Sequence, residues 1–167
     1  MTKGKFVLNN QNLSTLTIYG VGDFEAFSGN KQYRNKINSV NIPMQGAIPP
    51  GVYYIVHRPT GGWKGVIRTD LHDFYSWVTP YPVNKAEWFA LYRKDGKIDD
   101  YTRINGVKRG NFRLHPQGPL HISEGCITLE NGSDFKTIRQ ALTTNNPTKL
   151  ENGLDCFGTI EVVADAK

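Results

Sequence analysis

Two side chains capable of covalent chemistry lie close together in the middle of this sequence. Cys126 carries a thiol, the strongest nucleophile among ordinary side chains, and His115 carries an imidazole that titrates near neutral pH. A thiol with a base beside it is the minimum requirement for nucleophilic acyl chemistry. The pair therefore predicts a site at which a cysteine attacks a carbonyl group.

The local pattern around both residues is that of β-strands. In segments 111–115 and 126–129 apolar residues alternate with polar or reactive ones, so each strand would place its apolar side chains on one face. If the two strands pair in one sheet with the apolar faces in the core, the opposite face is lined by four side chains: Arg113, His115, Cys126 and Thr128.

The run Ser123-Glu-Gly-Cys126-Ile, preceded by a strand with a histidine, resembles the active-site signature of L,D-transpeptidases of the YkuD-like type. The usual run in that family is Ser/Thr-His-Gly-Cys, with the catalytic histidine further upstream. Here Glu124 stands in the position before the glycine, and His115 lies closer to the cysteine. With those departures the sequence is similar to the L,D-transpeptidase-type effectors of type VI secretion systems. These effectors carry Phe-Arg-Leu-His-Pro and then Ser-x-Gly-Cys-Ile-Thr. The resemblance extends upstream through three segments: 27–29, 48–55 and 88–93.

The resemblance implies a function. It predicts a cysteine L,D-carboxypeptidase or L,D-transpeptidase that removes or exchanges the terminal D-alanine of a peptidoglycan stem peptide. It also implies an antibacterial toxin made in the cytoplasm, delivered by the type VI secretion machinery and active in the periplasm of a target bacterium. A periplasmic immunity protein would be its other partner. A thiol mechanism needs neither a cofactor nor a metal.

The residues around the pair receive supporting roles. We expect Ser123 to support the catalytic pair, by orienting His115 or by capping the turn, and Arg113 to bind a substrate carboxylate through two hydrogen bonds. Gly125 would allow a tight turn whose backbone N–H groups face an oxyanion, and Thr128 would line the pocket. A nearby imidazolium and arginine would lower the pKa of the thiol. His121 competes for the role of base, but its position five residues before Cys126 favours a place in the loop over the site.

Two other functional classes fit parts of the pattern. A small metal site could use His115, His121 and Cys126 with Asp134 or Cys156, although this spacing matches no common zinc motif. A non-catalytic cell-wall-binding module would share the fold but would not need a thiol. Cys156 has apolar neighbours, which favours a buried hydrophobic role over a disulfide with Cys126.

Composition limits the remaining classes. A chain of 167 residues suits one domain over 1–167, and a net charge of +5 without a long basic stripe argues against nucleic-acid binding. The densest basic run, from Lys108 to Arg113, lies beside the candidate site. The N-terminus lacks the apolar region of a signal peptide, and no stretch has the ~20 apolar residues of a membrane span.

The rest of the chain predicts a mainly β fold (a β-rich α+β class), with a curved mixed sheet and one principal helix after the Cys126 strand. Helical spacing of apolar residues starts near Asn131 or Ser133 and ends before Pro147. Strands are expected at 6–8, 13–19, 24–27, 52–56, 88–93 and 159–163, with a hairpin turn at 20–23 and a further turn at 94–96. Segment 28–45 reads as a long loop, a solvated surface excursion in preference to a binding-site flank, and 97–104 as a polar connection. His57 is expected at a strand edge and His72 in a loop ion pair, and the aromatic residues of 60–86 would pack over the sheet or border a groove.

Overall fold

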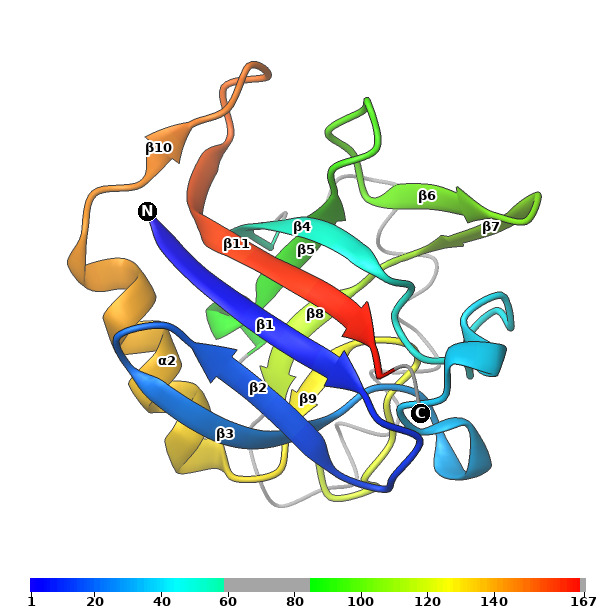
Figure 1. Ribbon diagram of the computed structural model, residues 1–167. Coiled ribbons are helices and arrows are strands. Elements are labelled where there is room, and N and C mark those ends of the chain that lie inside the picture. Colours follow the sequence, from blue (N-terminus) through cyan, green and yellow to red (C-terminus); the bar gives the residue numbers. More distant parts are fainter. Residues whose placement is uncertain (59–84, 166–167) are drawn as a thin grey trace.

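The computed structural model describes residues 1–58 and 85–165, which form strands, short 3-10 turns and one α-helix (Figure 1). The strands are β1 (Thr2–Leu8), β2 (Ser14–Ile18), β3 (Gly22–Phe27), β4 (Gly51–His57), β5 (Phe89–Arg93), β6 (Tyr101–Ile104), β7 (Val107–Gly110), β8 (Arg113–Pro116), β9 (Ile127–Leu129), β10 (Thr148–Lys149) and β11 (Asp155–Ala164). The helix is α2 (Gly132–Thr144), and the 3-10 turns are η1 (Lys31–Tyr33), η2 (Ile37–Ser39) and η3 (Lys85–Glu87). The prediction of a mainly β fold with one principal helix is confirmed.

The main sheet closes on itself. Its strand order is β1-β2-β3-β9-β8-β5-β4-β11-β10, and β1 also pairs with β11, so the strands from β1 to β11 form a barrel with β10 at its edge (Figure 1). The pairs β1–β11 and β8–β9 are parallel, and the other pairs of this sheet are antiparallel. The sequence predicted a curved mixed sheet but not its closure, which removes the exposed edges that an open sheet would present.

The core fills the barrel and extends under the helix. Alternate residues of the strands point inward, such as Phe6 and Leu8 of β1. Helix α2 contributes Phe135, Ile138 and Leu142 to the same cluster and contacts β8, β9 and β11. Burying each of these three side chains stabilises the fold by roughly 1.5–3 kcal/mol. The helix thereby supports the two strands that carry the candidate site.

Segment 97–104, for which the sequence suggested a polar connection, contains strand β6. Strands β6 and β7 form a separate two-stranded antiparallel sheet, closed by Asn105 and Gly106 at φ of 49° and 80°. Both residues are in the left-handed region that a tight two-residue hairpin turn requires, and Asn-Gly is the pair best suited to it. The hairpin projects from the barrel beside β8 and ends at Gly110, immediately before the site (Figure 1).

Segment 28–47 contains the turns η1 and η2 and is partly buried, which corrects the expectation of a solvated loop. Ser28, Asn35 and Ser39 are buried, and each hydrogen-bonds to backbone groups of the segment or of the adjoining Ile48. Short polar side chains can satisfy buried backbone groups without a ladder, so a polar sequence here builds a compact structure. The segment therefore flanks the candidate site and does not project into solvent as a free loop.

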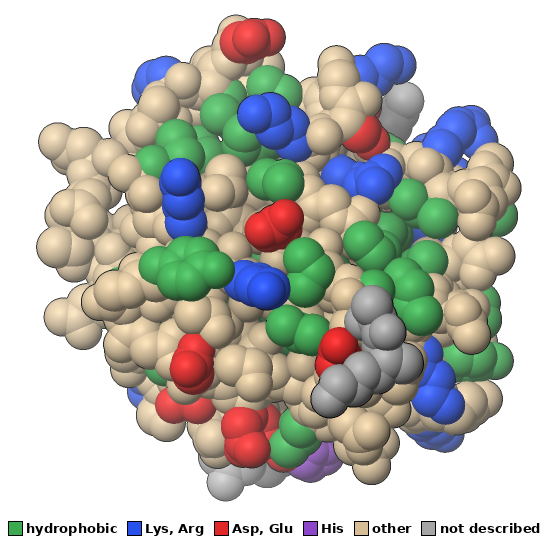
Figure 2. Space-filling model, in the orientation of Figure 1, with side chains coloured by type: hydrophobic (Ala, Val, Ile, Leu, Met, Phe, Trp, Pro, Cys, Tyr) green, Lys and Arg blue, Asp and Glu red, His purple; other side chains and the backbone are tan. Residues whose placement is uncertain are grey.

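Of the two other histidines that the sequence analysis considered, the structure describes His57 but not His72. His57 is exposed at the end of β4, as expected, and packs edge-on against Phe157 at 4.5 Å between ring centroids. His72 and the aromatic residues of 60–84 lie outside the described residues. Within 1–58 and 85–165, no helix has the length and apolar content needed to cross a bilayer. On the face drawn in Figure 2, basic and acidic side chains are interspersed over the molecule.

Candidate active site

The site is organised by the parallel pairing of β8 and β9. Their register places His115 opposite Thr128 and Leu114 opposite Ile127. Leu114 and Ile127 belong to the core, so His115 and Thr128 share the other face, and the Thr128 hydroxyl lies 3.4 Å from His115 Nε2. The sequence prediction that these two segments pair with their apolar faces inward is confirmed. Cys126 precedes β9 and is on the same side of the strand as Thr128.

The tautomer of His115 follows from its hydrogen bonds. Nδ1 lies 2.7 Å from the carbonyl oxygen of Pro116, which can only accept, so Nδ1 carries the proton. In the neutral ring, Nε2 is therefore the basic nitrogen, and it faces Thr128. The indole of Trp88 stacks on the imidazole at 4.3 Å with planes 19° apart, which fixes the ring orientation. His115 is 6% exposed.

The Cys126 thiol is held in its protonated form. Sγ donates to the carbonyl oxygen of Asn111 at 3.7 Å and accepts a hydrogen bond from the backbone N–H of Arg113. Burial raises the pKa of Cys126 to about 11, and the charge of Arg113 opposes that rise without cancelling it. The expectation of a lowered thiol pKa is therefore wrong for this structure, because the side chain is only 9% exposed and desolvation outweighs the neighbouring cation.

The turn before Cys126 is fixed by Ser123 and Gly125. The buried Ser123 hydroxyl donates to the carbonyl oxygen of Cys126 at 2.8 Å and accepts from the Gly29 N–H at 3.4 Å. Gly125 has a φ of +101°, a conformation that favours glycine, and a Cβ there would lie 2.7 Å from Arg109 Nη2. Ser123 thus acts on the backbone of the turn, and Gly125 is required by both its φ and its neighbour.

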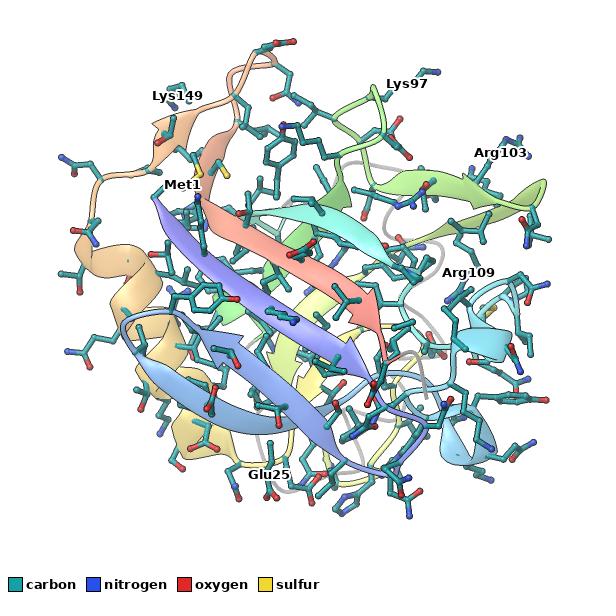
Figure 3. The ribbon with its side chains drawn as sticks, viewed as in Figure 1. Met1, Glu25, Lys97, Arg103, Arg109 and Lys149 are labelled. Carbon is teal, nitrogen blue, oxygen red and sulfur yellow. The ribbon has the colours of Figure 1, made fainter. Side chains whose placement is uncertain are left out.

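Arg109 is a structural element of the site that sequence reasoning did not identify. Its side chain is 3% exposed, extends from β7 and donates to the carbonyl oxygens of Val40, Gly46 and Ala47 (Figure 3). These bonds tie segment 28–47 to β7, beside the turn that contains Gly125. Burial of the guanidinium away from water lowers the pKa of Arg109. The only signal in the sequence was its place in the basic run beside the site.

The guanidinium of Arg113 is engaged by an acidic residue. Nη1 and Nη2 each donate to a carboxylate oxygen of Asp100 at 2.6 Å, and Nη1 also donates to the Phe112 carbonyl at 2.9 Å. The two side chains are 13% and 19% exposed. The two-pronged carboxylate binding that the sequence assigned to Arg113 is thus made within the protein, by a residue that the sequence analysis did not consider.

His121 lies in the loop between β8 and β9, as expected. It has a φ of +50° and an exposed side chain, and its carbonyl oxygen accepts a hydrogen bond from Arg34 at 2.7 Å. On either side of His121 within this loop, Leu120 and Ile122 carry exposed apolar side chains.

The cysteines and the proposed metal ligands do not cluster. Cys126 and Cys156 are both free, and Cys156 is a buried residue whose thiol lies 3.1 Å from the Gly158 carbonyl oxygen. In the part of the chain that the structure describes, no group of three or more His, Cys, Asp or Glu side chains is placed to hold a metal ion. The metal-site interpretation of His115, His121 and Cys126 therefore has no geometric support.

Comparison with known proteins adds one positive finding. Residues 22–152 match the family model of the Tlde1 domain, a span that covers most of the chain and includes every candidate site residue. No curated protein matches the chain.

Proposed function

Because the chain belongs to the Tlde1 domain family of type VI secretion L,D-transpeptidase effectors, we propose that it is a cysteine enzyme acting on peptidoglycan stem peptides. The reaction would be L,D-carboxypeptidase cleavage or L,D-transpeptidase exchange of the terminal D-alanine. The observation that supports this proposal most directly is the parallel pairing of β8 and β9, in which His115 lies opposite Thr128, two residues after Cys126.

The proposed reaction begins with proton transfer. His115 Nε2 takes the proton of Cys126 Sγ, and the thiolate attacks the carbonyl carbon of the L-centre residue before D-alanine, a diaminopimelate by resemblance to the family. The C–S bond forms as the carbonyl becomes an oxyanion, which backbone N–H groups of the Gly125–Cys126 turn stabilise. The oxyanion collapses, the C–N bond breaks, and the amine of D-alanine leaves with the proton from His115.

The thioester is resolved by the second substrate. Water gives a tripeptide and completes carboxypeptidase action, whereas the amine of a free D-amino acid gives an exchanged tetrapeptide. In both cases His115 accepts the proton of the attacking group, and the thiolate of Cys126 leaves and regains a proton. Trp88 and the Pro116 carbonyl keep the imidazole in the orientation and tautomer that these transfers require.

The remaining residues have positioning roles in this proposal. Ser123 fixes the carbonyl of Cys126, Thr128 lies against Nε2 of His115, and Gly125 permits the turn that aims the N–H groups. His121 belongs to the loop beside the site, where it would meet the substrate.

Digestion of purified muropeptides tests the proposal. The protein is incubated with disaccharide tetrapeptides, with and without an added D-amino acid, and products are identified by mass spectrometry. We expect tripeptide or exchanged tetrapeptide from the wild type and neither product from Cys126→Ser. Cys156→Ser is the matched control, because it makes the same change at a buried cysteine and should keep the activity. Trimming by Cys126→Ser would exclude the mechanism.

The proposed biological setting follows from the family. The protein would pass through the type VI secretion machinery of the producing cell and act in the periplasm of its target. An immunity protein in that compartment would protect sister cells by covering the site that contains Cys126.

A further inference from the structure

Asp100 lies beside the thiol site although it comes from another hairpin. It directly precedes β6, and its backbone carbonyl accepts a hydrogen bond from the Asn111 N–H at 3.1 Å. Its carboxylate binds both terminal nitrogens of Arg113 at 2.6 Å. Asn111 and Arg113 are the two residues whose backbone groups contact the sulfur of Cys126. Asp100 is therefore hydrogen-bonded to both residues that contact the thiol. Its backbone carbonyl accepts from Asn111, and its carboxylate accepts from Arg113.

We propose that Asp100 is a positioning residue that fixes the Arg113 guanidinium beside Cys126 and offsets part of its charge, so that this cation does not release the thiol proton before His115 takes it. This inference rests on the proposed function, since it takes Cys126 to be the nucleophile. It assigns the β6–β7 hairpin a role in the reaction: the hairpin delivers a carboxylate that limits the effect of Arg113 on the thiol.

The charged groups around Cys126 come from several elements. Arg113 and His115 are on β8, Glu124 is in the adjoining turn, Asp100 comes from the start of the hairpin, and Arg109 of β7 packs against Gly125. Arg113 favours the thiolate, whereas Glu124 and Asp100 disfavour it. Arg113 and Asp100 form a two-pronged, largely buried pair, so the carboxylate offsets part of the effect of the guanidinium at the sulfur, and the effect of Arg113 is the larger of the two.

Removing one member of the pair should therefore expose the charge of the other. Asp100→Asn keeps the side-chain shape and one acceptor oxygen but leaves Arg113 uncompensated, which should stabilise the thiolate. Arg113→Met leaves Asp100 uncompensated and should destabilise the thiolate. Opposite shifts from the two variants are the signature of charge balance, because a loss of packing alone would not change sign with the charge removed.

The experiment is an ultraviolet titration of the thiolate in the full-length protein. The absorbance of each variant is measured against pH, and the curve of the same variant carrying Cys126→Ser is subtracted to isolate Cys126. We expect Asp100→Asn to lower the pKa of Cys126 by about one unit and Arg113→Met to raise it by a similar amount. The pKa of Cys126 in the double variant Asp100→Asn/Arg113→Met should lie between those of the two single variants.

Two controls keep the result interpretable. Asp155→Asn removes a carboxylate from the exposed pair with Lys149 on β10 and β11 and should leave the titration of Cys126 unchanged. Circular dichroism checks folding, and if Arg113→Met does not fold, Arg113→Lys takes its place: it keeps the positive charge and should leave the pKa near the wild-type value. An unchanged or raised pKa in folded Asp100→Asn would overturn the proposal.

The test separates this inference from the proposed function because the titration requires no substrate. If the thiol responds as expected but muropeptides are not cleaved, the charge balance stands and the enzymatic assignment fails.

Discussion

At the scale of single residues, the site pairs a protonated thiol with a histidine of defined tautomer. The carbonyl of Pro116 takes the Nδ1 proton of His115, so the base of the proposed reaction is Nε2. The carbonyl of Asn111 accepts from the thiol, which favours the neutral form. In the proposed reaction this neutral thiol becomes a nucleophile only when His115 removes its proton, so the cysteine and the histidine would act as one unit.

This unit predicts strongly non-additive mutant effects. Cys126→Ala and His115→Ala should each lower turnover by at least about 100-fold, and the double variant should be little worse than either single one. His121→Ala should keep measurable activity, because its side chain is exposed in the loop. The measurement is trimming of tetrapeptide to tripeptide, with circular dichroism as a folding check. An active His115→Ala together with an inactive His121→Ala would assign the base to His121.

The buried thiol also predicts a pH dependence of stability. The pKa of Cys126 rises from the ordinary value of 9.0 to about 11 in the folded protein, so above pH 9 the unfolded chain loses this proton while the native state keeps it. The thiol's contribution to the free energy of unfolding is therefore complete below pH 9 and is lost as the pH rises to about 11. The loss should be about 2–3 kcal/mol. Denaturant unfolding at both ends of this range measures it, and Cys126→Ser, which does not titrate there, should lack that part of the loss.

At the scale of elements, the site depends on a parallel strand pair joined by a short loop. Parallel neighbours usually require a crossover of a dozen or more residues. Here β8 and β9 have only four and three residues, so a loop can return the chain to the start of β9 without a helix. The end of that loop is the turn at Ser123–Cys126, and Ser123 ties it to the start of segment 28–47 by accepting a hydrogen bond from the Gly29 N–H.

The turn should not tolerate a side chain at Gly125. Gly125→Ala would place a Cβ 2.7 Å from Arg109 Nη2 at a φ of +101°. We expect it to lower the free energy of unfolding by about 1–3 kcal/mol and to reduce kcat strongly, because the N–H groups of the turn move. Gly118→Ala in the same loop is the control, since a Cβ there meets nothing within 4 Å. Comparable losses in the two variants would refute a specific role for the turn at Gly125.

At the scale of the whole molecule, a closed barrel with a supporting helix encloses the larger of the two hydrophobic clusters that the described residues form. Closure through β1 and β11 leaves the β8–β9 pair inside a continuous sheet, with α2 packed on both strands. In the proposed reaction this scaffold would keep the base close to the nucleophile. Its substrate, by the proposed function, occurs outside the cytoplasm.

The proposed substrate therefore predicts toxicity that depends on the compartment. Expression in the bacterial cytoplasm should be harmless, whereas the same chain with an added periplasmic signal sequence should inhibit growth. Cys126→Ser with the same signal sequence is the control and should be tolerated. Growth curves and the muropeptide profile of the expressing cells provide the measurement. Equal toxicity from both compartments would indicate another target.

The sequence by itself determined the residues of the reactive pair and the elements that carry them. Alternation around His115 and Cys126 predicted two strands with a common face, and helical spacing after Asn131 predicted α2, because side-chain direction follows directly from the period of each element. The family pattern likewise rests on a short contiguous run ending at Cys126. All of these signals are local in the chain.

Only the tertiary structure decided which distant residues meet at that pair. The bonds from Arg113 to Asp100 and from Arg109 to the carbonyl of Gly46 join separate segments, as does the stacking of Trp88 on His115. Such contacts depend on strand order and barrel closure, and those follow from packing the whole core, not from any local period. For the same reason the thiol pKa was misjudged: neighbouring charges can be counted in a sequence, but desolvation depends on burial in the finished fold.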